Sequence, residues 1–560
     1  MIDQLARAAT SLEGQFCLPR GGGHKSDRFG YYGYCPPARP LREERRFASV
    51  DLIGIEKSAL ASVSRLLRRA FEMTFLNRRT LLAGGGLLLG AACTRRFATP
   101  DQAGTLPIPR LLDARDHGQR IGLRAQEGET TFFPGRRSAT MGYNGSYLGP
   151  TLRVHRGDDV TVTVSNNLSA DTTVHWHGLL VPGELDGSPH QTISPGETWR
   201  PTLPIRQPAA TLFYHSHAHG QTAEQVYAGL AGLLFVTDEE EQGLGLPSDY
   251  GVDDLPILIQ DRQFVDGRLV LPAGMMVALD GRRGNVILVN GAYNPRADVP
   301  RSLVRLRLVN GSNARTYDLS FSDGRAFYWI GTEGGLLEKS VELQSLPLAS
   351  GQRAEILVDF SDGRPVSLVS APDQSTLRMH GMSMMHRHEA SENNAGNETV
   401  LTFSPRLASS KRGSTTLPLL LASRAVPDPA TVVARRRLVL NMRLGGMMDS
   451  DEEPLTINHR RFDMDRIDEE VELGAVEIWK VSGQKMAHPF HIHGVHFDVL
   501  SRDGEEPDLL DQGPRDTIVV DEPVELLIRF DQPASKAPFL FHCHILEHED
   551  EGMMGQFSVT

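Results

Sequence analysis

Short runs of alternating apolar and polar residues fill the chain from about residue 104 onward. Residues 151–154 and 160–164 are examples, and Gly, Pro, Asn and Asp stand between such runs. A period of two is typical of strands with one buried face, and short strands separated by turn residues favour β-sandwiches. Because no long helical periodicity competes with this pattern, the sequence predicts an all-β fold.

The length of this β-rich region predicts three domains. It holds roughly 460 of the 560 residues, which divide into three sandwiches of about 150 residues each. An acidic stretch at 238–242 and a linker-like stretch at 404–435 suggest the boundaries. We expect domains at about 104–240, 250–405 and 435–560. A Met/His-rich segment, Met379 to His388, is expected to form a loop near the end of the second domain.

An apolar run at 81–92 is too short for a transmembrane helix, which needs about 20 residues. The pair Arg78-Arg79 precedes it and small residues follow it, so residues 73–99 are predicted to be a Tat-type export signal to the periplasm. We expect translation to begin at Met73 and residues 1–72 to be an over-extended N-terminus. A genuine leader domain is the alternative. A lipid anchor on Cys93 is a further, less favoured possibility.

Charge and cysteine content exclude several classes of function. The chain has 58 basic and 70 acidic residues, a net charge of -12, and no Lys/Arg-dense block in its body, which argues against a nucleic-acid partner. Four scattered cysteines are too few for a disulfide framework. If the signal is removed, Cys543 is the one cysteine left, and such a residue is either a liability or a ligand.

Histidines recur in a pattern that favours metal binding. An H-x-H pair in a strand places both imidazoles on one face, because side chains alternate. A single pair could be a surface or core feature, but four pairs, one of them flanking Cys543, have no packing reason to recur. The motifs are His175-Trp-His177, His215-Ser-His217, His488-Pro-Phe-His491-Ile-His493, and His542-Cys543-His544 followed by His548 and Met553.

The ligand types indicate copper. Two histidines, a thiolate and an axial methionine make a blue-copper site, and His488, Cys543, His548 and Met553 supply that set. Eight further imidazoles are too many for one ion and could hold a cluster of three coppers. These eight are His175, His177, His215, His217, His491, His493, His542 and His544. Cys543 lies between His542 and His544, which gives electrons a covalent path between the two sites.

On these motifs, residues 104–560 resemble the multicopper oxidases, and within them the bacterial copper efflux oxidases. The resemblance implies three cupredoxin-like Greek-key domains, four copper ions per chain, and reduction of O2 to water by electrons from a reducing substrate. We also expect a monomer. The resemblance assigns the type 1 site to His488, Cys543, His548 and Met553, the type 2 site to His175 and His491, and the type 3 pair to His177, His215, His217, His493, His542 and His544.

Oxygen reduction also consumes protons, so carboxylates are expected near the cluster. Asp186 and Glu549 match acidic positions with a relay role in the copper efflux oxidases. Solvated loop acids are the alternative interpretation of both residues.

Thioethers favour Cu(I), so methionines near the blue site indicate cuprous ion as the reductant. Met442, Asp449 and Met486 are the substrate-copper candidates, although Gln484 stands where the relatives have an aspartate and their long methionine-rich insert is absent. The 379–388 segment is the candidate for a copper-collecting arm in its place. We therefore expect oxidation of Cu(I) to Cu(II) in copper tolerance.

Three other functions share parts of this pattern. A laccase-like oxidase of phenols or diamines would take a small aromatic reductant, and both activities could coexist. A scaffold that has lost its ligands is disfavoured because every ligand position is filled. A copper nitrite reductase has a two-domain chain in a trimer and lacks the four motifs.

Overall fold

The computed structural model describes residues 104–376, 396–407, 417–443 and 454–560. Several predicted features lie outside these ranges: the N-terminal segment 1–72, the export signal with Cys93, the Met/His-rich segment 379–388, and Asp449. Within the described part the chain is built almost entirely of strands, which confirms the all-β prediction. No helix of that part is both long and apolar enough to cross a membrane.

Residues 111–237 form two mixed sheets. The first has the order β1 (Leu111–Asp113), β4 (Thr151–His155), β10 (Ala231–Thr237), β9 (Ala210–His215) and β6 (His175–His177). The second has the order β3 (Arg136–Tyr143), β2 (Arg120–Phe133), β5 (Asp159–Asn167) and β7 (Thr198–Trp199), with β8 (Thr202–Pro204) also paired to β5. β5 shows the predicted alternation, since Val160, Val162 and Val164 are buried between exposed or half-buried neighbours.

Residues 254–406 form a larger pair of sheets and a short hairpin. One sheet has the order β15 (Ala292–Tyr293), β14 (Val286–Val289), β11 (Asp254–Arg262), β17 (Leu303–Asn310), β22 (Arg353–Asp359), β19 (Phe327–Thr332) and β20 (Gly335–Leu343). The other has the order β16 (Arg296–Pro300), β24 (Glu398–Arg406), β23 (Val366–Ala371), β18 (Tyr317–Phe321) and β21 (Ser345–Leu348). The hairpin pairs β12 (Phe264–Val265) with β13 (Arg268–Leu269).

Residues 434–559 form two five-stranded sheets. One has the order β26 (Leu455–Ile457), β25 (Ala434–Met442), β28 (Val476–Gly483), β32 (Val524–Arg529) and β30 (Phe497–Arg502). The other has the order β27 (Glu469–Val471), β34 (Met554–Val559), β33 (Phe539–Cys543), β29 (His488–Ile492) and β31 (Thr517–Val520). β29 and β33 carry two of the histidine motifs and are neighbours in this sheet.

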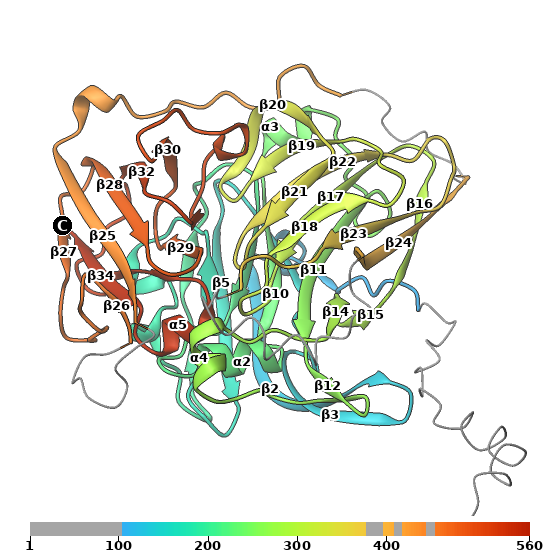
Figure 1. Cartoon of the computed structure of the whole chain (residues 1–560), viewed down its shortest axis with the longest axis horizontal. Helices are drawn as coiled ribbons and strands as arrows, with labels where there is room; N and C mark the ends of the chain where they lie inside the picture. The colour runs from blue at the N-terminus through green and yellow to red at the C-terminus, as the bar shows by residue number, and fades with distance from the viewer. Residues whose placement is uncertain (1–103, 377–395, 408–416, 444–453) are drawn as a thin grey trace, which may run out of the picture. The chain divides into compact units, whose positions relative to one another are not determined.

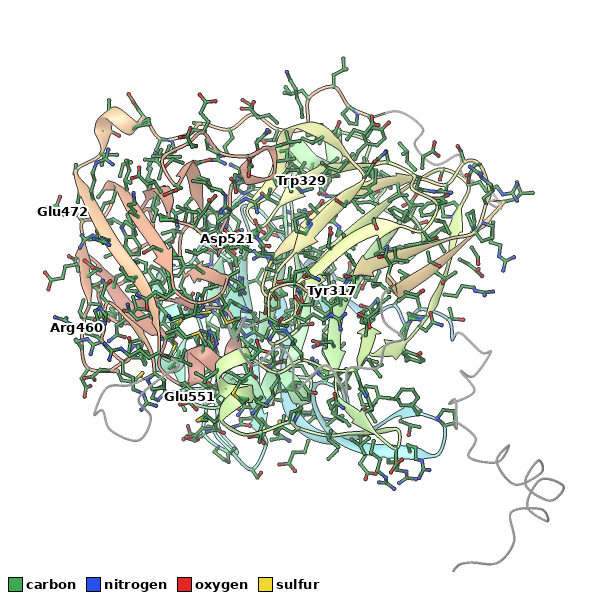
Figure 2. All side chains as sticks on the ribbon, in the orientation of Figure 1. Tyr317, Trp329, Arg460, Glu472, Asp521 and Glu551 are labelled. Carbon is green, nitrogen blue, oxygen red and sulfur yellow. The ribbon has the colours of Figure 1, made fainter. Side chains whose placement is uncertain are left out.

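Each pair of sheets encloses an apolar core that contains one buried tryptophan. These are Trp176, Trp329 and Trp479, each at most 2% exposed. Trp329 and Tyr317 are labelled among the strands in Figure 2, and both belong to the core of the 254–406 region.

The helices are few and short: α2 (Thr222–Ala228), α3 (Glu239–Gly243), α4 (Met275–Asp280) and α5 (Leu546–Asp550), with 3-10 turns at Arg115–His117, Gly183–Leu185, Pro189–Gln191, Pro429–Thr431 and Leu509–Asp511. The acidic stretch 238–242, which the sequence suggested as a domain boundary, lies between β10 and β11 and forms most of α3. Asp238 caps this helix by accepting a hydrogen bond from the Glu241 N–H at 2.7 Å. α2, α4 and α5 lie together in Figure 1, and α5 contacts both of the others.

A buried ionic cluster joins α3 to the seven-stranded sheet. Arg305 and Arg307 on β17 contact three carboxylates. Arg307 Nε donates to Asp254 at 2.8 Å, and its Nη2 donates to Glu241 at 3.0 Å. Arg305 Nε donates to Glu355 at 2.8 Å. Every member is at most 7% exposed, so each buried charge depends on its partners.

This cluster gives a pH-dependent prediction. Burial alone would raise the pKa of Glu355, but Arg305 and Arg307 lower it from 4.5 to about 2. A carboxyl with a lowered pKa stabilises the fold above its unfolded pKa and loses that contribution as the pH falls. The stability advantage of the wild type over Glu355→Gln should therefore be largest near neutral pH and shrink between pH 4.5 and about 2.

Urea denaturation of the metal-free chain at a series of pH values measures this advantage. Glu338→Gln, an exposed change on β20 of the same sheet, is the control and should show no such trend. An advantage that is constant with pH would contradict the charge-pairing account of Glu355.

Candidate metal centre

The predicted type 1 residues meet between β33 and α5. Cys543 ends β33, His488 begins the adjacent β29, and His548 lies on α5. The Cys543 Sγ atom lies 3.4 Å from Nδ1 of His488 and 3.5 Å from Nδ1 of His548. All three side chains are fully buried. One sulfur and two imidazole nitrogens therefore face one another in a closed, dry pocket.

Backbone carbonyls fix which nitrogen of each ring faces the sulfur. The Nε2–H of His488 donates to the Gln484 carbonyl at 3.0 Å, and the Nε2–H of His548 donates to the Leu279 carbonyl at 2.9 Å. These hydrogen bonds assign the proton of each ring to Nε2. Each Nδ1 atom is therefore unprotonated and has a free lone pair. Burial lowers the pKa of His488 to about 4 and that of His548 to about 3, so both rings are neutral at physiological pH.

Met553 lies in the same core. It is fully buried in the apolar cluster that also contains Cys543. Its N–H donates to the His548 carbonyl at 2.8 Å, and its carbonyl accepts the Cys543 N–H at 3.2 Å. These two hydrogen bonds hold the segment from His548 to Met553 against β33, the strand that carries Cys543.

The other eight predicted histidines gather in a second cluster. Two of them, His175 and His177, lie on β6. The other six come from the ends of three strands and the residues just after them: His215 and His217 at β9, His491 and His493 at β29, and His542 and His544 at β33. In the sheet ladders, His175 pairs with His215 and His491 pairs with His542. Each of the eight is at most 2% exposed. The structure thus brings together every histidine that the motifs predicted.

Close approaches within this cluster test whether metal ions fit. Nε2 of His542 lies 3.1 Å from Nε2 of His493 and 3.2 Å from Nε2 of His217, and Nδ1 of His177 lies 3.3 Å from Nε2 of His215. Two nitrogens bound to one ion at about 2.0 Å and a near-tetrahedral angle are about 3.3 Å apart. The spacing therefore suits shared metal ligation.

The proton assignments support the same conclusion. His542 Nδ1–H donates to the Cys543 carbonyl at 3.0 Å, and His493 Nδ1–H donates to the Asp186 carboxylate at 2.8 Å. Both rings thus present unprotonated Nε2 atoms to each other with no hydrogen between them. Two buried lone pairs at this distance repel unless a cation lies between them, so the donor set fits a metal.

His175 and His491 form the part of the cluster predicted as type 2. Nδ1–H of His175 donates to the Asp186 carbonyl at 3.0 Å, and Nδ1–H of His491 donates to the Asp516 carbonyl at 2.9 Å. The Nε2 atoms of both rings, and that of His544, are buried without a hydrogen-bond partner. A buried acceptor without a partner is costly, and an ion would satisfy it.

The two predicted relay acids lie beside the cluster rather than in solvated loops. Asp186 is fully buried and contacts His493 at 2.8 Å and His175 at 3.4 Å. Glu549 is 1% exposed, with its oxygens 3.2 Å from Nδ1 of His217 and 3.3 Å from Nδ1 of His542. Each acid therefore reaches two of the predicted ligands.

Their electrostatic settings differ. Burial would raise the pKa of Asp186, but His175 and His493 hold it below its usual range. Burial and the neighbouring Asp550 raise the pKa of Glu549 well above its usual range. Carboxyls whose pKa values are pushed apart in this way are suited to different proton roles.

Sequence reasoning missed a third acid, Asp516, and its partner Arg353. Arg353 Nη1 donates to Asp516 Oδ1 at 2.7 Å, and the same oxygen lies 3.3 Å from His177 Nε2 and 3.4 Å from His491 Nδ1. Both residues of the pair are fully buried. They join β22 to the chain before β31, and no local sequence signal marks either residue, because the contact spans 163 positions.

Two glycines leave room for the histidines. Gly187 has a φ of +80°, and a Cβ there would overlap the Val174 carbonyl next to His175. Gly351 has a φ of +82°, and its Cβ would come 2.8 Å from the His544 ring. Any other residue at either position would be strained and would push against a predicted ligand.

The substrate-copper candidates lie on the His488 side of the sulfur site. Met442 ends β25 and is only 1% exposed, and Met486 is partly buried against the same core. Gln484 connects them: its carbonyl accepts from His488, and its side-chain Oε1 accepts the Met442 N–H at 3.4 Å. The third candidate, Asp449, lies outside the described residues.

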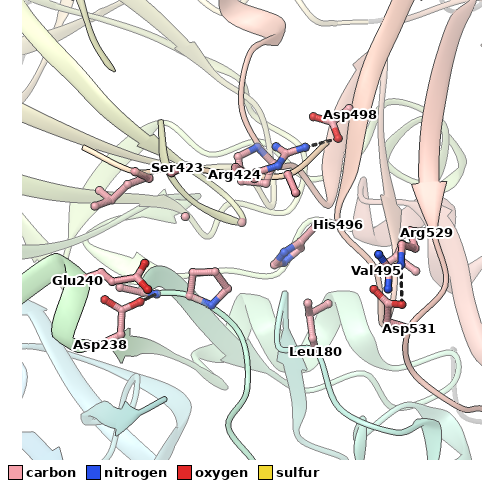
Figure 3. A pocket seen from close by; sticks show the side chains of 18 of the residues that line it. Leu180, Asp238, Glu240, Ser423, Arg424, Val495, His496, Asp498, Arg529 and Asp531 are labelled. Carbon is pink, nitrogen blue, oxygen red and sulfur yellow. Dashed lines mark hydrogen bonds and ion pairs between the residues drawn. The ribbon is translucent and has the colours of Figure 1, made fainter. Parts of the chain in front are cut away.

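A separate cavity of about 290 Å³ lies behind the third histidine motif (Figure 3). Its lining includes His496, whose Nε2–H donates to the Gly178 carbonyl at 3.1 Å, and the ion pair of Arg424 with Asp498. None of the twelve predicted copper ligands is among its described lining residues. We therefore do not place the chemistry there.

Comparisons with known proteins agree with this arrangement. Sequence models of multicopper oxidase domains match residues 124–241 and 434–560. The chain is 37% identical to the multicopper oxidase mco of Staphylococcus aureus, over 81% of this chain and 92% of that protein. It is also 40% identical to the cell division protein FtsP of Xenorhabdus nematophila, over 87% of this chain and 99% of that protein.

One solved structure is similar to this chain in both sequence and fold. The laccase-like multicopper oxidase CueO from Ochrobactrum sp., described as having oxidase activity towards lignin model compounds and lignosulfonate, is 37% identical with a TM-score of 0.73. The match covers 81% of this chain and all of that one. With relatives this similar over nearly their whole length, the chain belongs to the multicopper oxidase family, whose cupredoxin-like members are copper oxidoreductases that use O2.

Proposed function

We propose that this protein oxidises Cu(I) to Cu(II) while reducing O2 to water, and that it serves copper tolerance. It would bind four copper ions: one held by His488, Cys543, His548 and Met553, one by His175 and His491, and two by His177, His215, His217, His493, His542 and His544. Its three domains would span about 104–240, 250–405 and 435–560. When bound, copper supplies the one-electron redox chemistry and the site at which O2 is reduced.

The observation that carries the oxidase assignment is the position of Cys543. Its sulfur faces His488 and His548, while its chain neighbours His542 and His544 belong to the eight-histidine cluster. A few covalent bonds therefore connect the two predicted sites. Such a connection has no use in a binding protein or scaffold, so it favours an oxidase over the cell-division role that the name of the relative FtsP suggests.

Soft ligands beside His488 support cuprous ion as the substrate. We propose that Met442 and Met486, with Asp449, bind it next to the residue that accepts the electron. Gln484 supplies no negative charge there, so its binding is expected to be weaker than with an aspartate. A laccase-like activity on phenols or diamines is the second candidate, because the Ochrobactrum relative is described as acting on lignin model compounds.

Asp186 and Glu549 are proposed to deliver the four protons that water formation consumes. Each is buried and lies against two cluster histidines. Glu549→Gln keeps the size of the side chain but cannot pass a proton. We expect it to slow turnover by about 10²-fold, because a positioned proton donor contributes about 10²–10⁴-fold.

Stopped-flow measurements show which half-reaction the substitution slows. Anaerobic reduction of the blue band by substrate should be unchanged in Glu549→Gln, whereas reoxidation by O2 should be slow. Glu551→Gln, an exposed change two residues away, is the matched control. Equal slowing of both half-reactions would show that the variant disturbs the fold and not proton delivery.

Oxygen uptake by the copper-loaded protein tests the proposal. It is measured with a stabilised Cu(I) complex and, separately, with dimethoxyphenol, each with and without excess Cu(II). Rapid uptake with Cu(I), and weak phenol oxidation until Cu(II) is added, is the expected result. Fast phenol oxidation without added copper, together with little Cu(I) oxidation, would replace the proposal with a laccase.

We also propose that the protein acts in the periplasm as a monomer after Tat-dependent export. The basis is the twin-arginine pattern within residues 73–99. Mass spectrometry of the N-terminal peptides of the native protein would identify the processed end, and a mature chain that retains residues 1–72 would contradict this proposal.

A further inference from the structure

Helix α4 exposes two adjacent methionines. Met275 is 58% exposed and Met276 is 46% exposed, whereas Leu279 on the same short helix is only 3% exposed. Leu279 belongs to the core that contains Cys543 and Met553. One end of α4 thus presents thioethers to solvent, while the other end packs into the predicted type 1 site.

The buried end of α4 touches a predicted ligand directly. The Leu279 carbonyl accepts the Nε2–H of His548 at 2.9 Å. From Met275 to Leu279 is four residues, which is about one helical turn. A through-bond path therefore leads from the exposed thioethers to the imidazole that faces Cys543. It runs through the methionine side chain, about one turn of the α4 backbone and one hydrogen bond.

Several contacts hold α4 in this position. The backbone N–H of Arg282 donates to Glu547 on α5 at 3.0 Å, and its guanidinium pairs with the same carboxylate at 3.2 Å. Gly281 has a φ of +80°, and a Cβ there would overlap Ala314 and Ile545. The two helices lie side by side in Figure 1. The distance between the methionines and His548 is thus fixed by packing.

We propose that Met275 and Met276 form a docking site for substrate Cu(I) at the His548 edge, distinct from the Met442 and Met486 side. This inference rests on the proposed cuprous oxidase function. Each docked Cu(I) loses one electron, which leaves through α4 and the Leu279 carbonyl toward His548, and departs as Cu(II). Four such ions supply the four electrons that, with four protons from solvent, convert one O2 to two waters.

The chemistry of the patch selects this occupant. Thioether sulfur is a soft, uncharged donor that prefers Cu(I) to Cu(II), so the oxidised ion is released readily. The two arginines that follow the helix do not repel a cation, because Arg282 pairs with Glu547 and Arg283 pairs with Asp373 at 2.8 Å.

Silver(I) tests the site without turnover, since it is a soft monovalent ion that does not donate electrons at this site. We would titrate Ag(I) into the copper-loaded wild type and into Met275→Leu/Met276→Leu, which keeps side-chain volume and helix propensity. Met141→Leu, a half-buried change on β3, is the matched control. The double variant should lose an Ag(I) site that the wild type and the control retain.

Anaerobic reduction of the blue band gives the second readout. Reduction by a Cu(I) complex should be slowed about tenfold or more in the double variant, while reduction by dimethoxyphenol is unchanged. If the wild type oxidises Cu(I) and the double variant matches it in both Ag(I) binding and Cu(I) kinetics, the α4 site is wrong and the proposed function stands. If the wild type does not oxidise Cu(I), the proposed function fails, and this substrate site fails with it.

Discussion

Cys543→Ser is expected to abolish the blue absorption and to lower turnover with any reductant by a factor on the order of 10³ or more. Serine has nearly the same shape, but its hydroxyl is a hard, weakly acidic donor that does not replace a thiolate in a blue-copper site. The sulfur is also the point where the two predicted sites are joined through the chain. Visible absorption and oxygen uptake by the copper-loaded variant measure the two effects.

Stability and copper content separate this effect from unfolding. Ile545→Val is the control, because Ile545 is buried beside Cys543 and its N–H lies 3.5 Å from the sulfur. Removing one methylene there should cost about 0.5–1.5 kcal/mol and leave the protein blue and active. The eight-histidine cluster should still bind copper in Cys543→Ser. A serine variant that remained blue and active would show that Cys543 is not the ligand.

Asp516→Asn should be the most damaging change outside the predicted ligands. It leaves the fully buried Arg353 guanidinium without a countercharge. Loss of one member of a buried ion pair lowers the free energy of unfolding by about 3–5 kcal/mol. Asp516 also lies against His177 and His491, so both rings lose an orienting neighbour. Copper affinity of the cluster should fall by about 10–100-fold.

The measurements are the free energy of unfolding and the copper content after dialysis against a chelator. Asp511→Asn is the matched control: Asp511 is buried and pairs with Arg502 at 2.8 and 2.9 Å, but Arg502 is partly exposed and also reaches Asp521. The control should cost less and retain all its copper. Full copper retention in Asp516→Asn would contradict an orienting role.

The strands and the convergence of the histidine motifs were predictable because both follow from local sequence patterns. The alternation around Val160 to Val164 gives β5, and each H-x-H pair places two imidazoles on one face of a strand. The predicted ligands therefore converge once the sheets form. The assignment of Cys543 as a ligand rests on its flanking histidines and on its spacing to His548 and Met553, and it stays a prediction.

Contacts made by backbone atoms, or between distant segments, could not be predicted in this way. Asp516 and Arg353 are 163 positions apart, and neither belongs to a repeating motif. Leu279 supplies only its carbonyl, which every residue has, so nothing in its side chain marks the contact with His548. No sequence pattern marks Met275 and Met276, because their proposed role depends on that contact.

The outer nitrogens of His488 and His548 are both held by main-chain oxygens, those of Gln484 and Leu279. Main-chain oxygens are independent of side-chain identity, so mutations at positions 484 and 279 preserve the acceptor as long as the backbone keeps its path. The exposed position 484 is therefore free to vary, whereas Leu279 is constrained by its packing in the core. Substitutions at position 484 can therefore change the surface beside His488 while the acceptor that orients its ring is kept.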